Sequence, residues 1–162
     1  MDLKKKILNA LSEDARISAE KLAVMFGTEK EVVENAIAEM EEDGVIVKYT
    51  AVINNEKMGE QLVDALLEVK VTPQARAGFE KIAEDLACFP EVKSVFLMSG
   101  TYDFSVSLEG KTMREVAEFI SEKLSGIECV TSVITHFILK KYKDGGVVLC
   151  ENKTSKRITI HE

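Results

Sequence analysis

The stretch from Val95 to Leu108 predicts two short strands joined by a tight turn. Apolar residues alternate with small or polar ones on both sides of Gly100 and Thr101, and this period of two is typical of half-buried strands. Gly100 suits the turn because glycine tolerates positive φ. A hairpin is therefore expected at the centre of this half of the chain, with the flanking segments arranged around it.

One acidic residue, Asp103, follows the turn in an otherwise uncharged stretch. A carboxylate beside free backbone N–H groups has the chemistry to hold the amino and carboxylate groups of a small zwitterion. The alternative is structural: Asp103 faces solvent, or it accepts a hydrogen bond from the backbone of the turn. The residues alone leave both interpretations open.

The segments around the hairpin give the element order βαββαβ. Strands are predicted over Leu62–Val71, which Pro73 ends, and over Val130–Tyr142. A helix before the hairpin has an apolar stripe formed by Phe79, Ile82, Ala83 and Leu86. The helix after it opens with a capping box at Thr112 and Glu115, and its predicted inward side chains are Met113, Val116, Ala117, Ile120 and Leu124. This order predicts a ferredoxin-like antiparallel sheet with both helices on one face.

Helices on one face leave the other face of the sheet bare. A large uncovered apolar surface is unusual in a monomer, so we expect a second copy of the chain to cover it. The resulting two-fold symmetry would also bring two N-terminal modules together, as two DNA half-sites require.

The first fifty residues predict three short helices. Asp2 and Ser18 stand at N-cap positions of the first two, and residues 28–31 form a capping box before the third. The apolar stripe of the third helix is Val32, Val33, Ala36, Ile37 and Met40. Glycines at 27 and 44 end the second and third helices, and residues 45–47 are expected to begin a strand. This pattern is typical of a winged-type helix-turn-helix module, although small helical bundles without DNA function look similar.

The charge of the third helix argues against strong DNA binding. Between Thr28 and Asp43 there is one base, Lys30, against seven acidic residues. Phosphate contacts supply much of the affinity of DNA-binding proteins, so such a helix enters a groove only through its N-terminal turn. A solvated acidic face on a structural helix is the alternative.

Composition excludes several classes of protein. The chain has 162 residues, 46% of them hydrophobic, and a formal net charge of −7. No apolar run is long enough for a membrane span and no secretion signal is visible, so a cytoplasmic protein is expected. The three cysteines are widely spaced, and His136 and His161 are too few for a metal site. No nucleophile–base pair or phosphate loop is present, so we predict neither an enzyme nor a cofactor.

Several stretches resemble the Lrp/AsnC family of feast/famine regulators. They are ARISAEKLAVMFG, EMEEDGVIVKYTAVIN, GTYDF and VTSVITHFILK, and the resemblance extends over residues 2–142. It implies a DNA-binding transcription regulator that forms homodimers and often octamers. It also implies that a small effector, commonly an amino acid, binds between dimers near the central turn.

The resemblance assigns the effector site to the turn and the last strand. Its residues are Gly100, Thr101, Tyr102, Asp103 and Thr135, with His136 beside the last. Asp103 would hold the amino group of the effector, and backbone N–H groups near Gly100 would hold its carboxylate. The family commonly has a second Thr where this chain has Val133, which leaves the set of ligand contacts less complete.

The third helix departs from the family pattern. Ala36 stands where the family commonly has Arg, and Glu39 and Glu42 stand where further bases are common. DNA contacts then depend on the remaining candidates, which are Arg16, Thr28, Lys30 and Asn35. We therefore expect a modest affinity for double-stranded DNA that falls steeply with salt.

The sequence thus predicts an α+β chain in four parts: a helix-turn-helix domain at 1–53, a linker at 54–60, a ferredoxin-like ligand-sensing and oligomerisation domain at 61–142, and a basic tail at 143–162. The leading hypothesis is a transcription regulator that responds to an amino acid. The alternative is a ligand-sensing oligomer whose acidic helical domain binds a protein partner and not DNA.

Overall fold

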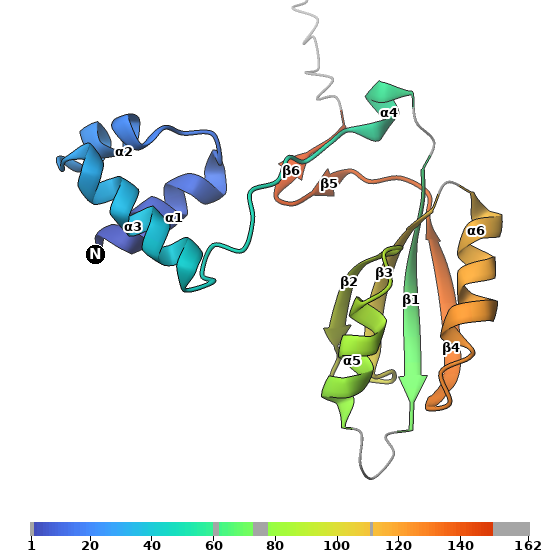
Figure 1. The fold of residues 1–162 in the computed structure, drawn as a ribbon. Coiled ribbons are helices and arrows are strands. Elements are labelled where there is room, and N and C mark those ends of the chain that lie inside the picture. The colour runs from blue at the N-terminus through green and yellow to red at the C-terminus, as the bar shows by residue number, and fades with distance from the viewer. Residues whose placement is uncertain (1, 60–61, 73–77, 111, 151–162) are drawn as a thin grey trace, which may run out of the picture. The chain divides into compact units, whose positions relative to one another are not determined.

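The computed structural model describes residues 2–59, 62–72, 78–110 and 112–150. Pro73, His161 and the tail beyond residue 150 lie outside these ranges. The chain divides into two compact units, Met1–Val52 and Ile53–Glu162, and each is treated by itself (Figure 1). Within the described ranges, no helix is both long and apolar enough to cross a membrane.

The first unit is a bundle of three helices: α1 (Leu3–Glu13), α2 (Ala19–Phe26) and α3 (Lys30–Glu42). The predicted caps of α2 are confirmed, because the Ser18 hydroxyl accepts a hydrogen bond from the Lys21 amide and Gly27 adopts a φ of 65°. The helices enclose a small core of fully or nearly buried side chains: Ile7, Leu22, Ala23, Val33, Ala36 and Met40.

Three local predictions in this unit are wrong. The capping box at residues 28–31 does not form, because the N-cap of α3 is Glu29 and its side chain makes no capping hydrogen bond. Asp2 does occupy the N-cap position of α1, as predicted, without a capping hydrogen bond from its side chain. Val32 is 44% exposed and lies outside the core. No strand forms over residues 45–53 of the described chain, because the Ile46 amide donates to the Met40 carbonyl and its side chain packs against the helices.

The second unit confirms the ferredoxin-like prediction. Its strands are β1 (Val63–Val71), β2 (Val92–Leu97), β3 (Phe104–Gly110) and β4 (Val130–Ile138), and they form one antiparallel sheet in the order β2-β3-β1-β4. Helix α5 (Phe79–Ala87) and helix α6 (Met113–Glu118) lie on the same face of this sheet (Figure 1).

A short helix and a short two-stranded hairpin lie at the end of the sheet where β1 begins (Figure 1). Helix α4 (Asn55–Met58) precedes β1, and strands β5 (Lys143–Asp144) and β6 (Val147–Val148) pair in a separate hairpin. Strand β4 ends at Ile138 and not at Tyr142 as predicted. Ile138 pairs with Asp64 at the start of β1, and among the described residues the pairing of β4 with β1 extends no further in this direction.

Alternation along β1 builds the core of this unit. Ala65, Leu67 and Val69 are fully buried, and β3 places Phe104, Val106 and Leu108 beside them. The helices add buried side chains from above: Ile82, Leu86, Val116, Phe119 and Leu124. Edge-to-face ring pairs, with centroids 6.0 Å apart for Phe79–Phe104 and 5.3 Å for Phe89–Phe119, join both helical segments to the core.

A π-helical turn, Phe119–Leu124, continues α6 and changes which residues face inward. The Thr112 cap is confirmed, since its hydroxyl accepts from the Glu115 amide at 3.1 Å. Residues five apart lie above one another in such a turn, so Phe119 and Leu124 both reach the core. The predicted inward positions of Met113 and Ala117 are wrong, because both are exposed.

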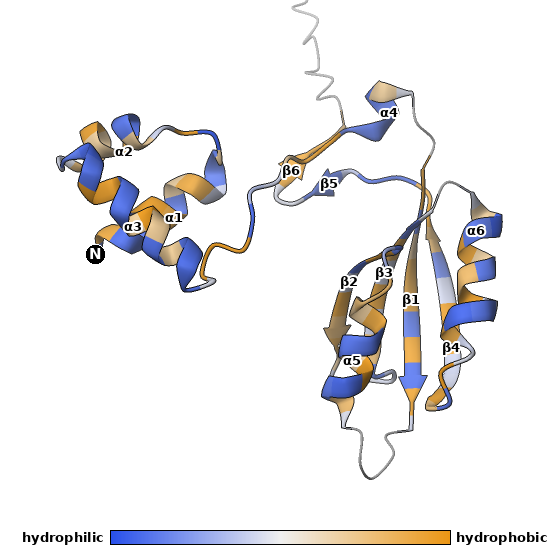
Figure 2. Ribbon diagram, in the orientation of Figure 1, coloured by the Kyte–Doolittle hydropathy of each residue, from blue (hydrophilic) through white to orange (hydrophobic). Residues whose placement is uncertain are grey.

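The uncovered face of the sheet is more polar than predicted. The alternation that sends Leu67 into the core sends Leu66 and Glu68 to the other side, and Figure 2 shows polar and apolar bands along β1. The hydroxyls of Ser94 and Ser107 lie 2.6 Å apart there, beside exposed apolar residues such as Phe96 and Ile134. Apolar side chains are thus exposed on this face, as expected, but polar ones are interspersed among them.

The π-helical turn generates a stability prediction. Phe119→Ala should lower the free energy of unfolding by about 3–5 kcal/mol, because it empties a core position. Met113→Ala, six residues earlier on the exposed side, should change it by less than about 0.5 kcal/mol. Urea denaturation followed by circular dichroism measures both. Equal effects would contradict the assignment of inward residues.

Candidate functional site

The loop between β2 and β3 carries most of the predicted effector residues. It is longer than the expected two-residue turn, since β2 ends at Leu97 and β3 begins at Phe104. The Met98 amide donates to the Asp103 carbonyl at 2.7 Å and closes the loop. Gly100 is exposed and does not use a positive φ, contrary to the sequence argument.

Asp103 is tied to the end of β1. Its Oδ2 atom accepts from the Val71 amide at 2.8 Å, and its own amide donates to the Val69 carbonyl at 3.0 Å. The β1–β3 ladder stops at the Val69–Phe104 pair, and the β1–β4 register shifts between Lys70 and Val71. The Asp103 carboxylate therefore provides the Val71 amide with the hydrogen-bond acceptor that a carbonyl of a neighbouring strand would otherwise provide. The structural alternative was that Asp103 accepts a hydrogen bond from the backbone of the turn. Asp103 does accept a backbone hydrogen bond, but the donor belongs to β1 and not to the turn.

The structure does not place Thr135 and His136 in one site within a single chain. Thr135 pairs with the buried Leu67 and is half-buried on the face that the helices cover. His136 projects to the opposite face, where its Nε2 lies 3.0 Å from Glu68 Oε1. Neighbouring residues of a strand point to opposite faces, so a ligand that contacts both must reach around the sheet or be shared between chains.

The candidate DNA-binding residues lie around the α2–α3 turn. Lys30 and Asn35 are exposed on α3, Thr28 is half-buried in the turn, and Arg16 is exposed ahead of α2. Lys30 Nζ lies 3.0 Å from Glu20 and 3.4 Å from Glu34, and hydrogen bonds to these two carboxylates raise its pKa. The one base of α3 is therefore already paired inside the unit.

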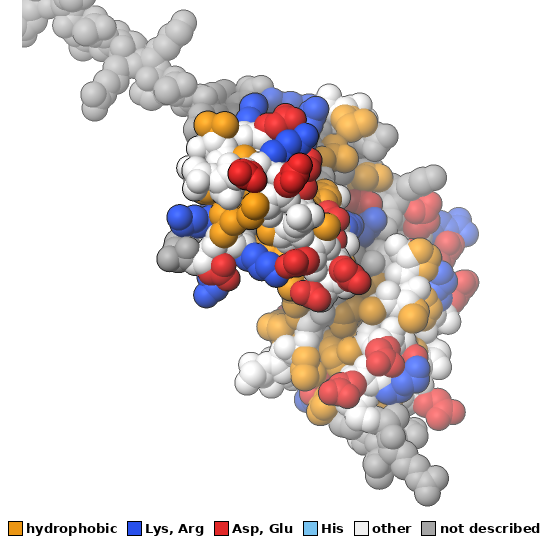
Figure 3. Space-filling view, turned by 60° about the vertical axis from the view of Figure 1, so that its left-hand side comes forward, with side chains coloured by type: hydrophobic (Ala, Val, Ile, Leu, Met, Phe, Trp, Pro, Cys, Tyr) orange, Lys and Arg blue, Asp and Glu red, His pale blue; other side chains and the backbone are white. Residues whose placement is uncertain are grey.

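Carboxylates dominate the rest of this helix. Figure 3 shows acidic side chains spread over the helical unit where it comes forward. Lys4 of α1 pairs with Glu39 at 2.8 Å, and the Tyr49 hydroxyl donates to Glu41 at 2.9 Å. A DNA phosphate has to compete with these contacts. Local charge thus favours a weak, salt-sensitive nucleic-acid interface.

The second unit also contains a cavity that the sequence did not predict. A cavity of about 410 Å³ opens where β1 begins and β4 ends, and Asn54, Glu56, Lys140 and Lys141 contribute to its lining. Its walls come from two segments, residues 53–64 and 138–149, which are far apart in the sequence and which no local pattern links. In the described ranges, no group of three or more His, Cys, Asp and Glu residues is arranged to hold a metal ion.

Both units match models of known protein families. A family model described as winged helix-turn-helix DNA-binding matches residues 2–47, and the Lrp/AsnC ligand binding domain matches residues 64–148. An uncharacterized HTH-type transcriptional regulator of Bacillus subtilis, YugG, is 44% identical over 96% of this chain and 94% of that protein. The HTH-type transcriptional regulator FL11 of Pyrococcus furiosus is 30% identical, with 88% of this chain and 91% of that protein covered.

Solved structures show the same fold. An AsnC family transcriptional regulator from Agrobacterium tumefaciens matches with a TM-score of 0.72 and 26% identity, over 89% of this chain and 94% of that one. A transcriptional regulator from Neisseria meningitidis, crystallised as a complex with L-Met, matches with a TM-score of 0.71 and 23% identity, over 89% and 92%.

The Asp103–Val71 contact generates a second prediction. Asp103→Ala should lower the free energy of unfolding by about 1–3 kcal/mol, because it leaves the Val71 amide without its partner. Amide hydrogen exchange at Val71 should accelerate. Thr101→Ala, an exposed position in the same loop, serves as the matched control. Unchanged exchange at Val71 in Asp103→Ala would show that the hydrogen bond contributes nothing.

Proposed function

The chain belongs to the Lrp/AsnC family of helix-turn-helix transcription regulators, and on that premise we propose that it binds specific DNA sequences and that an amino acid controls this binding. The observation that carries the proposal is the pairing of the two modules, a helix-turn-helix over residues 2–47 and a ligand-binding domain over residues 64–148. The relatives reported above are named as regulators and not as enzymes. A DNA-binding regulator works where the chromosome lies, so we assign it to the cytoplasm.

The proposed effector site is the β2–β3 loop. Asp103 keeps one carboxylate oxygen beyond the Oδ2 that binds Val71, and this oxygen is assigned to the amino group of the effector. Backbone N–H groups near Gly100 are assigned to its carboxylate. The L-Met complex of the Neisseria relative supports an amino acid as the class of ligand. Tyr102 and Thr101 complete the loop side of the site.

Assembly completes the proposed site. Thr135 and His136 face opposite sides of β4, so one chain does not offer both to a ligand held at its own loop. We therefore propose a homodimer, and further assembly to an octamer, in which loops and strands of different copies meet. Exposed apolar side chains on the uncovered sheet face, such as Phe96 and Ile134, support contact between copies.

DNA contacts are proposed for the α2–α3 turn and its surroundings. Thr28, Lys30 and Asn35 face the groove, and Arg16 contacts the phosphate backbone. Lys30 has to exchange Glu20 and Glu34 for a phosphate, which reduces the gain from this contact. The alternative, a helical unit that docks a protein, draws on the acidity of α3, but the regulator names of the relatives do not favour it.

The pairing of Lys30 gives a prediction about affinity. Replacing Glu20 and Glu34 together by Gln should strengthen DNA binding and steepen the slope of log K against log salt by about 0.9, because one more base contacts a phosphate. Glu80→Gln with Glu122→Gln, in exposed positions of the other unit, changes net charge equally and is the control. An equal gain in both double variants would indicate a general charge effect.

The function itself is tested by fluorescence anisotropy with DNA from upstream of the coding region of the protein, against a random duplex at low and physiological salt. We expect a preference for the upstream DNA that survives physiological salt and that changes when amino acids are added. Equal binding to both duplexes, abolished by salt, would reject sequence-specific control at that segment. Specific binding that no amino acid alters would reject the effector while keeping the DNA function.

A further inference from the structure

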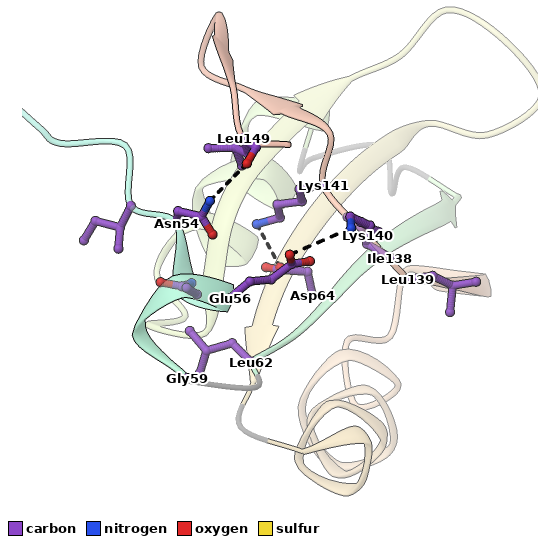
Figure 4. A pocket seen from close by; sticks show the side chains of 12 residues that line it. Asn54, Glu56, Gly59, Leu62, Asp64, Ile138, Leu139, Lys140, Lys141 and Leu149 are labelled. Carbon is purple, nitrogen blue, oxygen red and sulfur yellow. Dashed lines mark hydrogen bonds and ion pairs between the residues drawn. The ribbon is translucent and has the colours of Figure 1, made fainter. Parts of the chain in front are cut away.

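We propose that the cavity at the beginning of β1 is a second small-molecule site, which binds a zwitterion with an apolar side chain. It lies where Asp64 pairs with Ile138, whereas Asp103 contacts Val69 and Val71 at the far end of the same strand. The two sites are therefore separated by the length of β1. Figure 4 shows the cavity and the side chains around it.

Hydrogen bonds hold the walls of this cavity in place. The Asn54 amide group donates from Nδ2 to the Leu149 carbonyl at 3.1 Å, and its Oδ1 accepts from the Lys57 amide at 3.3 Å. The Leu149 amide in turn donates to the Tyr142 carbonyl at 2.9 Å. One side chain thus joins the start of α4 to the residue that follows β6, and it fixes two walls of the cavity relative to each other.

Two ion pairs of different kinds face the cavity. Lys141 Nζ lies 2.8 Å from Asp64 Oδ2, and both side chains are largely buried, at 32% and 19% exposure, so this pair is an internal part of the wall. Lys140 Nζ and Glu56 Oε2 are 3.9 Å apart and remain 46% and 68% exposed. That separation exceeds the length of a charge-assisted hydrogen bond, so both groups retain capacity for a ligand.

The looser pair matches the charges of an α-amino acid. Such a ligand carries its ammonium and carboxylate on one carbon, so its partners must be a neighbouring anion and cation. Glu56 supplies the anion and Lys140 the cation. A ligand with only one of these charges would leave the other protein group facing it without a partner.

Apolar side chains complete the lining. The apolar residues that line the cavity are Ile53, Leu62, Ile138, Leu139 and Leu149. In Figure 4, Ile138 lies next to Lys140 and Leu149 next to Asn54. Ile53 is 58% and Leu139 94% exposed, so an apolar ligand side chain would remove hydrocarbon surface from water on both sides. A volume of about 410 Å³ falls in the range of small-molecule pockets.

The position gives this site a mechanical role. Helix α4 directly follows the first unit in the chain, and β4 with the hairpin closes the second unit. A ligand held between Glu56 and Lys140 links α4 to the end of β4. Occupancy would therefore hold the first residues of the ligand domain against its sheet, independently of what binds at the β2–β3 loop.

The test is isothermal titration calorimetry of the full chain with L-leucine as the probe. All proteins carry Asp103→Asn, so that a site at the β2–β3 loop contributes less to the signal. Glu56→Gln and Lys140→Met should each weaken leucine binding by about tenfold or more, because each removes a charged partner. Lys81→Met removes another exposed lysine, which pairs with Asp85 on α5, and this variant should bind leucine as the parent does.

Ligand analogues distinguish a site that needs both charges of a zwitterion from a site that needs only one charge. Isocaproate lacks the amino group of leucine and isoamylamine lacks its carboxylate, and both should bind more weakly than leucine. Leucine binding that is lost with Asp103→Asn alone would overturn the inference while supporting the loop site. Leucine binding unchanged by Glu56→Gln and Lys140→Met, equal binding of the analogues, or no leucine binding by the full chain would also overturn it.

Discussion

The ligand domain depends on the double pairing of β1. This strand is hydrogen-bonded to β3 on one side and to β4 on the other, and its alternate residues Ala65, Leu67 and Val69 form the floor of the core. Burial of apolar surface is the dominant favourable term in folding, and here it fixes the register as well. Shifting β1 by one residue would place Glu68 under the helices. Both the β2–β3 loop and the cavity take their positions from the two ends of this strand.

The helical unit is governed by a different constraint, which is the placement of its charges. Its core holds only a few residues, while carboxylates cover much of α3. Lys4 and Lys30 are drawn into ion pairs with Glu39, Glu20 and Glu34. Exposed pairs of this kind add little stability. Their greater effect is on recognition, because they reduce the positive charge that a DNA backbone would meet.

Local signals in the sequence were sufficient for most of the fold. Ser18 and Thr112 cap their helices as predicted, since a cap depends on residues three positions apart, and the strands predicted over Leu62–Val71 and from Val130 onward are present as β1 and β4. The strand predicted after Gly44 failed because pairing needs a partner that no local pattern supplies. Phe119 was missed because the wide turn replaces the usual helical spacing. At the candidate site, Asp103 stood out in the sequence, but its hydrogen bond to Val71 joins residues 32 positions apart and could not be predicted from a local pattern. The resemblance grouped Thr135 with His136, whereas strand alternation turns their side chains to opposite faces of the sheet.

The hydrogen bond between Asn54 and Leu149 spans 95 positions of the chain and brings the start of the second unit close to the last residues that the structure describes. Domains whose first and last ordered segments lie close together tolerate insertion into other chains and circular permutation well. Such a unit can be joined to another module without rerouting its interior. The same fold is therefore suited to recombination in evolution, and to transplantation as an intact cassette onto an unrelated DNA-binding or reporter domain.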